Sequence, residues 1–168
     1  MKIQSTAEER KQAQNPHNIF VAGVFAFDLL MTPAVLGLKI GMIGLLIPLV
    51  CSGSLLLYIY LRSRKQTSWF VDMHWRLTWQ RSRLLLLGYA ISAFLVMVAW
   101  LLSMISSDPH MASIIWTALT RIALMPTLIF VLLTSVLEAS AIALASNGEV
   151  PDKLAAKYPP PVGSIKPV

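Results

Sequence analysis

Charged side chains are scarce in this chain. Asp, Glu, Lys and Arg make up 13% of its 168 residues, whereas hydrophobic residues make up 56%. Average globular chains are about 25% charged. A chain with roughly half that charge cannot cover a water-exposed surface, which excludes an ordinary soluble domain and indicates a membrane protein.

Reactive side chains are scarce as well. The one cysteine, Cys51, lies in an apolar run, which excludes a disulfide framework and a thiolate metal cluster. The three histidines, His17, His74 and His110, fall at expected membrane edges or loops, so no pair lies within two spans to bind a haem. The sequence has no HExxH, GxGxxG, GxxxxGK[ST] or GxSxG motif. We therefore expect no enzyme activity, no cofactor and no metal site.

Long apolar runs predict four transmembrane helices, at about 18–38, 40–61, 84–106 and 111–137. Each is long enough to cross ~30 Å of hydrocarbon at about 1.5 Å per residue. Only Lys39 is available as a turn between the first two spans, so they form a very tight hairpin or the first is re-entrant. The predicted fold is an all-α integral membrane protein.

The fourth apolar run continues to about Ala145 and is too long for one span. It therefore tilts, bends at Pro126 or extends into water. These runs predict a membrane domain over 18–145, between an N-terminal tail, 1–17, and a Pro-rich C-terminal tail, 146–168.

Both tails are polar and short. Ser5 and Thr6 each precede a glutamate by three residues, a capping-box spacing that favours a short helix ending before Pro16. The proline run near the C-terminus favours an extended, solvated tail.

Basic residues are distributed very unevenly about the spans. Lys39 alone falls on one side, and twelve fall on the other: Lys2, Arg10, Lys11, Arg62, Arg64, Lys65, Arg76, Arg81, Arg83, Lys153, Lys157 and Lys166. The positive-inside rule then predicts a bacterial-type inner-membrane protein with both termini in the cytoplasm. Binding to anionic lipid headgroups, rather than nucleic acid, accounts for the net charge of +6.

The segment 68–83 combines indoles with arginines. Phe70, Met73 and Leu77 recur at helical spacing opposite polar residues, which predicts an amphipathic helix at the cytoplasmic interface, separate from the third span or continuous with it. The segment either anchors the loop 62–83 at the membrane or docks a cytoplasmic partner. The candidate docking residues are Trp69, Phe70, Trp75, Arg76, Trp79 and Arg83.

Two charged residues lie inside predicted spans. A charge at a helix centre costs about 2.5–3.5 kcal/mol. Asp28 and Arg121 each lie ten residues, or about 15 Å, from the start of their spans, one from each face. We expect them to form an ion pair, which serves either as a clamp on helix register or as part of an ion or proton path.

Small residues recur at four-residue spacing near the end of the fourth span. Ser135, Ala139 and Ala143 form one such set, and Ala141 and Ala145 form another. This spacing favours close helix–helix packing. Glu138, between them, is expected to reach water at the cytoplasmic end without a buried partner.

These features predict a scaffolding or assembly subunit of a multiprotein membrane complex, such as secretion, conjugation or envelope machinery, with other membrane subunits as partners. The alternative is a homo-oligomeric small transporter or proton-coupled exporter that uses Asp28 and Arg121. A weaker alternative, a membrane enzyme or respiratory subunit, is disfavoured by the lack of histidine ligands.

Overall fold

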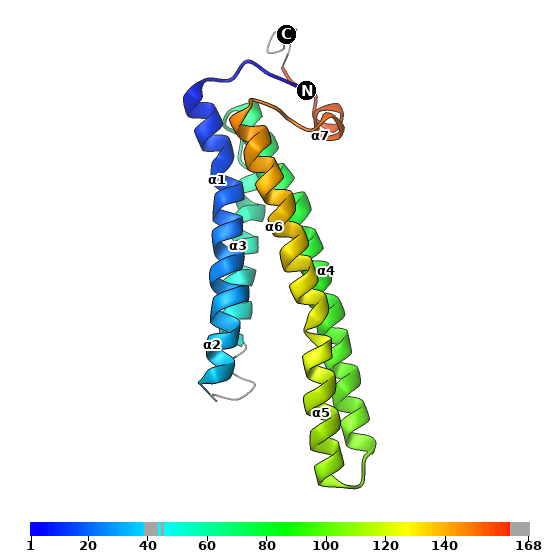
Figure 1. The fold of residues 1–168 in the computed structure, drawn as a ribbon. Coiled ribbons are helices and arrows are strands. Elements are labelled where there is room, and N and C mark those ends of the chain that lie inside the picture. The colour runs from blue at the N-terminus through cyan, green and yellow to red at the C-terminus, as the bar shows by residue number, and fades with distance from the viewer. Residues whose placement is uncertain (39–43, 45, 162–168) are drawn as a thin grey trace. The chain divides into compact units, whose positions relative to one another are not determined.

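The computed structural model describes residues 1–38, 44 and 46–161. The helices are α1 (Ala7–Val24), the π-helix η1 (Phe25–Met31), α2 (Thr32–Gly37), α3 (Leu46–Ser63), α4 (Trp69–Ile105), α5 (Pro109–Ala123), α6 (Met125–Ser146) and α7 (Asp152–Lys157) (Figure 1).

Four helical segments are long and apolar enough to cross a membrane: Ala7–Val35, Leu46–Ser63, Trp69–Ile105 and Pro109–Asn147. The prediction of an all-helical, multi-pass membrane protein with four spans is confirmed. The predicted hairpin at Lys39 lies outside the described residues.

The first span begins well before the apolar run. Thr6 caps α1: its hydroxyl accepts from the Glu9 amide at 3.1 Å, and the Glu9 carboxylate accepts from the Thr6 amide at 3.0 Å. This confirms the capping box, but the expected helix end before Pro16 is wrong, since Pro16 lies inside α1. Pro16 removes one helix hydrogen bond. Burial of neighbouring side chains, including His17 and Phe20, offsets that loss.

Close packing joins the first span to α3. A Cβ added at Gly23 would lie 2.1 Å from Leu55 Cδ2, so the α1 backbone approaches α3 where it has no side chain. After Val24 the chain continues as the π-helix Phe25–Met31, which is wider than an α-helix and contains Asp28.

The third span and the segment before it form one helix of 37 residues, α4. Asp72 fixes its start by accepting hydrogen bonds from the Thr67 amide at 2.9 Å and the Thr67 hydroxyl at 2.7 Å. Every residue from Phe70 to Trp75 is buried. The segment 68–83 is therefore continuous with the span and packed on several sides.

The fourth span is interrupted at Leu124, between α5 and α6. Pro126 follows two residues later and has no amide hydrogen to donate to the preceding turn. The interruption therefore lies at the predicted bend site, and α6 continues to Ser146, beyond the predicted end at 137.

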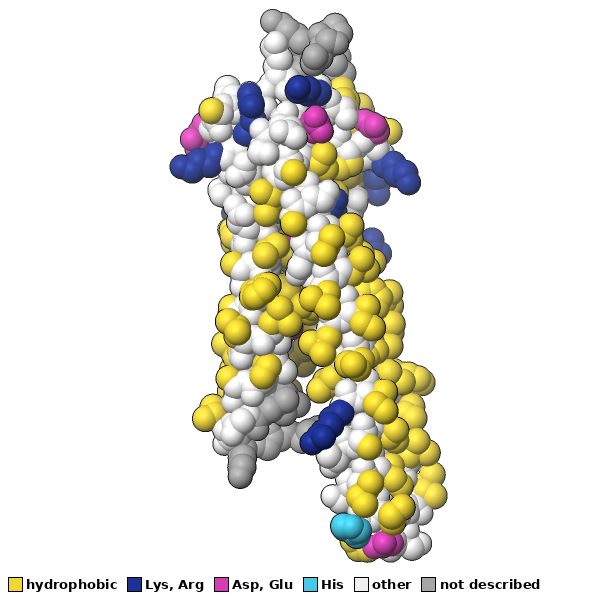
Figure 2. All heavy atoms as spheres, in the orientation of Figure 1, with side chains coloured by type: hydrophobic (Ala, Val, Ile, Leu, Met, Phe, Trp, Pro, Cys, Tyr) yellow, Lys and Arg dark blue, Asp and Glu magenta, His cyan; other side chains and the backbone are white. Residues whose placement is uncertain are grey.

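The chain divides into two compact units, one of Met1–Ser82 with the chain from Ser135 onward, and the other of Arg83–Thr134. The first unit has a hydrophobic core, called the terminal core below. It consists of Ile3, Ala13, Phe70, Met73, Leu77, Ala141, Ala145, Val150, Leu154 and Ala155. Charged side chains gather at the end of this unit where the N-terminal segment and α7 lie (Figure 2).

The terminal core corrects the expectation of a solvated C-terminal tail. Val150 and Leu154 are 1% and 3% exposed, and α7 lies in the tail that was expected to be solvated. The N-terminal segment holds this region by backbone hydrogen bonds, from Ile3 to Gly148 and from Val150 to Met1, each 2.9 Å. Apolar burial therefore orders a segment that composition alone favours as disordered.

The second unit is a helical hairpin with few polar contacts. A Cβ added at Gly88 of α4 would lie 2.8 Å from Phe130 Cβ of α6, so these helices are in close contact. Beside it, the Thr127 hydroxyl donates to the Ser92 hydroxyl at 2.8 Å.

Candidate functional site

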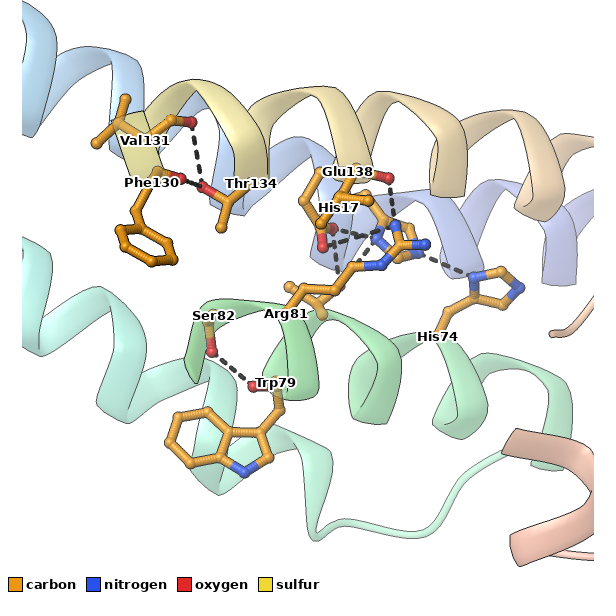
Figure 3. A network of polar contacts seen from close by, with 11 residues as sticks. His17, His74, Trp79, Arg81, Ser82, Phe130, Val131, Thr134 and Glu138 are labelled. Carbon is orange, nitrogen blue, oxygen red and sulfur yellow. Dashed lines mark hydrogen bonds and ion pairs between the residues drawn. The ribbon is translucent and has the colours of Figure 1, made fainter. Parts of the chain in front are cut away.

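The most specific arrangement of polar side chains in the first unit is a buried network that joins three helices (Figure 3). His17 comes from α1, His74 from α4 and Glu138 from α6, and each is 0% exposed. The side chains point toward one another although His17 and Glu138 are 121 residues apart in sequence.

The contacts form a linear chain. Glu138 Oε2 lies 2.5 Å from His17 Nδ1, and His17 Nε2 lies 2.9 Å from His74 Nδ1. His74 Nε2 lies 3.2 Å from the backbone oxygen of Glu149. That oxygen is held in place because Glu149 pairs with Lys2 in an isolated β-bridge.

The backbone carbonyl assigns the hydrogens in this chain, because a carbonyl oxygen only accepts. His74 Nε2 therefore carries a hydrogen. One hydrogen is needed between His74 and His17, and one between His17 and Glu138, since two lone pairs would otherwise face each other. Three hydrogens shared by two imidazoles and one carboxylate give a net charge of zero.

Thr78 and Arg81 complete the network from the next turns of α4. The Thr78 hydroxyl lies 2.9 Å from His17 Nδ1 and donates to Glu138 Oε2 at 3.3 Å. Arg81 donates to the Leu137 carbonyl, and its Nη1 lies 3.9 Å from Glu138 Oε1. Oε1 is buried and accepts no hydrogen bond among the described residues, so the guanidinium supplies its nearest compensating charge.

The arrangement can hold three helices in one register, because each contact of the chain between these side chains joins two different helices. Within the described residues no group of three or more His, Cys, Asp or Glu is placed to hold a metal ion.

One sequence-based expectation is corrected here. Glu138 is fully buried with partners rather than open to water. His17 and His74 lie inside helices, and their expected position at a membrane edge stays a prediction. The missed signal was spacing along each helix. His74, Thr78 and Arg81 recur at i, i+4, i+7 on α4, and Thr134, Glu138, Ala141 and Ala145 recur on one face of α6.

The intramembrane charges lie elsewhere. Asp28 is half-buried in η1 and accepts a hydrogen bond from the Ser52 hydroxyl of α3 at 3.0 Å. Arg121 is exposed in the last turn of α5, in the other unit. Their ion pair stays a prediction.

The candidate docking residues divide by burial. Phe70 and Trp75 are 3% and 4% exposed and serve the chain's own packing. The others keep part or all of their surface: Trp69, Arg76 and Trp79 are half-buried and Arg83 is exposed.

The two small-residue sets of α6 also differ in how far they are buried. Ala141 and Ala145 are 0% exposed and pack in the terminal core, whereas Ala139 and Ala143 are exposed and Ser135 is half-buried. The set Ser135, Ala139 and Ala143 therefore faces away from this core, and its packing role stays a prediction.

No protein-family model matches the chain, and no curated protein or solved structure matches it either. Function is therefore inferred from the residues themselves.

Proposed function

We propose that the protein is a non-catalytic scaffolding or assembly subunit of a multiprotein complex in a bacterial-type inner membrane, such as secretion, conjugation or envelope machinery. The observation that carries this proposal is the buried network of His17, His74 and Glu138. It fixes α1, α4 and α6 to one another at the end of the unit that contains the terminal core.

A fixed helix arrangement is what a scaffold needs, because a partner must meet the same surface every time. Buried charges constrain helix register more sharply than apolar packing, since a shift by one residue leaves each charge without its partner. The terminal core adds to this by joining the N-terminal segment and α7 to α4 and α6.

Partner-facing residues are available beside this fixed frame. In the membrane, Ala139 and Ala143 offer a flat helix face for another membrane subunit. At the interface, Trp69, Arg76, Trp79 and Arg83 keep accessible surface for headgroups or a cytoplasmic partner. Both termini then lie in the cytoplasm, the side that the basic residues favour.

Co-purification in mild detergent tests the proposal. We expect the wild-type chain to retain defined membrane partners and the double variant Ala139→Phe, Ala143→Phe to lose them while its melting temperature is unchanged. Leu132→Phe, at another exposed position of α6, is the matched control and should keep the partners. A wild-type chain that purifies without partners under all mild conditions would contradict a scaffolding role.

A second candidate function is a homo-oligomeric small transporter or proton-coupled exporter that uses Asp28 and Arg121. The observation that favours it is the π-helical turn around Asp28, since π-helical turns frequently occur at functional sites. A pH-dependent transport activity that Asp28→Asn abolishes, in a variant that remains assembled, would support this function. Unchanged transport in that variant would exclude a role for Asp28.

A further inference from the structure

A pocket of about 520 Å³ lies where α3 ends and α4 begins, and α7 closes one side of it. Tyr60, Arg64, Arg76, Trp79 and Tyr158 line it, and all belong to the first unit. Ser63 and Gln80 add a hydroxyl and an amide, and none of the described residues that line the pocket is acidic.

The two arginines of the pocket are oriented by aromatic rings rather than by carboxylates. The Arg64 guanidinium lies 4.5 Å from the centre of the Tyr60 ring, and the Arg76 guanidinium lies 4.1 Å from that of Tyr158. Across the described ranges 1–38, 44 and 46–161, neither guanidinium has an ion-pair partner within 4 Å. An aromatic ring attracts a guanidinium through its charge and does not replace a carboxylate as a hydrogen-bond acceptor.

Arg64 and Arg76 differ from Arg81 in having no acidic side chain among the described residues that line their pocket. Arg81 is balanced by Glu138, whereas Arg64 and Arg76 bring two positive charges to one pocket without an acid. Planar guanidinium groups bind phosphate oxygens by paired hydrogen bonds, and two of them match the oxygens of one phosphate.

We propose that this pocket binds the phosphate of an anionic phospholipid headgroup. A lipid is favoured over a soluble phosphate because the pocket lies at the end of the apolar span α3, beside Trp79 and two tyrosines. Tryptophan and tyrosine are enriched at headgroup depth. The acyl chains would then lie along the exposed apolar side chains of α3, such as Leu57 and Leu61.

Native mass spectrometry of the full chain, delipidated and then titrated with phosphatidylglycerol or phosphatidylcholine, tests the proposal. We expect phosphatidylglycerol to bind at least about tenfold more tightly, and Arg64→Gln with Arg76→Gln to remove that preference. Lys65→Gln with Lys153→Gln removes the same charge from exposed positions outside the pocket and is expected to leave the preference within about twofold.

Three results would overturn the proposal. The first is an unchanged preference in the Arg64→Gln, Arg76→Gln variant. The second is an equal loss in the Lys65→Gln, Lys153→Gln control, which would show only general attraction between charges. The third is displacement of the lipid by millimolar inorganic phosphate, which would assign the pocket to a soluble phosphate.

If the double glutamine variant does not fold, Arg64→Lys with Arg76→Lys replaces it. This variant keeps both charges but loses the planar guanidinium groups. We expect this variant to lose at least half of the preference for phosphatidylglycerol over phosphatidylcholine. An undiminished preference would equally overturn the proposal.

Discussion

The two units of this protein use opposite means to hold helices together. The first unit buries His17, His74 and Glu138 in a continuous hydrogen-bonded chain beside an apolar core. The second unit brings α4 and α6 together by backbone proximity at Gly88 and one hydroxyl pair, Ser92 with Thr127. Closely packed helices can shift slightly to accommodate a changed side chain, whereas a buried polar network is strongly destabilised when one of its members is removed. We therefore expect the first unit to be the less tolerant of substitution.

The largest expected effect comes from breaking the charge chain. Glu138→Ala leaves the buried His17 without its hydrogen-bond partner and Arg81 without its nearby carboxylate, and should lower the free energy of unfolding by about 3–5 kcal/mol. Glu138→Gln is the matched control, because its amide donates to His17 Nδ1 and keeps the chain neutral. Thermal unfolding in detergent measures both variants. Equal melting temperatures for Glu138→Ala and the wild type would contradict the role given to the network.

The second prediction follows from the count of hydrogens. The groups that face one another are His17 from α1, His74 and Arg81 from α4, and Glu138 from α6. Glu138→Gln keeps a hydrogen at each contact of the chain, because its amide donates to His17 Nδ1. Its melting temperature should therefore lie between those of the wild type and Glu138→Ala, and equal melting temperatures for Glu138→Gln and Glu138→Ala would contradict this count.

The third prediction compares the glycine contacts of the two units. Gly88→Ala places a methyl group 2.8 Å from Phe130 Cβ, an atom fixed to the helix backbone. It should destabilise the protein by about 1–3 kcal/mol. The Cβ added by Gly23→Ala meets the end of the Leu55 side chain, which can change its rotamer, so this variant should lose less stability. Thermal unfolding of the two variants side by side tests this order. A larger loss of stability for Gly23→Ala than for Gly88→Ala would contradict it.

The smallest expected effect is the loss of the hydroxyl pair in the second unit. Thr127→Val removes the hydrogen bond from the Thr127 hydroxyl to Ser92 and keeps the one from the Thr127 amide, so it should cost about 0.6 kcal/mol, the average for such bonds between membrane helices. If Thr127→Val lowered the free energy of unfolding as much as Glu138→Ala does in the same assay, the two units would not differ in the way proposed.

The sequence predicted the coarse fold because apolar runs of sufficient length have one stable form in a bilayer, a helix. It also predicted the capping box at Thr6 and the interruption near Pro126, because both depend on neighbouring residues. These features are local, so no knowledge of tertiary contacts was needed.

The site was harder to predict because its members are joined by tertiary contacts. His17 lies beside Pro16, which suggested a helix end, and Glu138 lies near the end of an apolar run, which suggested access to water. Only the packing of α1 against both α6 and α4 makes a buried chain of them. Asp28 and Arg121 drew attention because each is a single charge in an apolar run, a local signal that gives no partner.

The distance in sequence between the members of the network also has a consequence for biogenesis. His17 and His74 leave the ribosome well before Glu138, which lies in the fourth span. Until α6 is inserted, His17 of α1 lacks its hydrogen-bond partner from α6. Insertion of the fourth span therefore completes a polar network that begins in the first, and a chain that stops before residue 138 leaves His17 and His74 without Glu138.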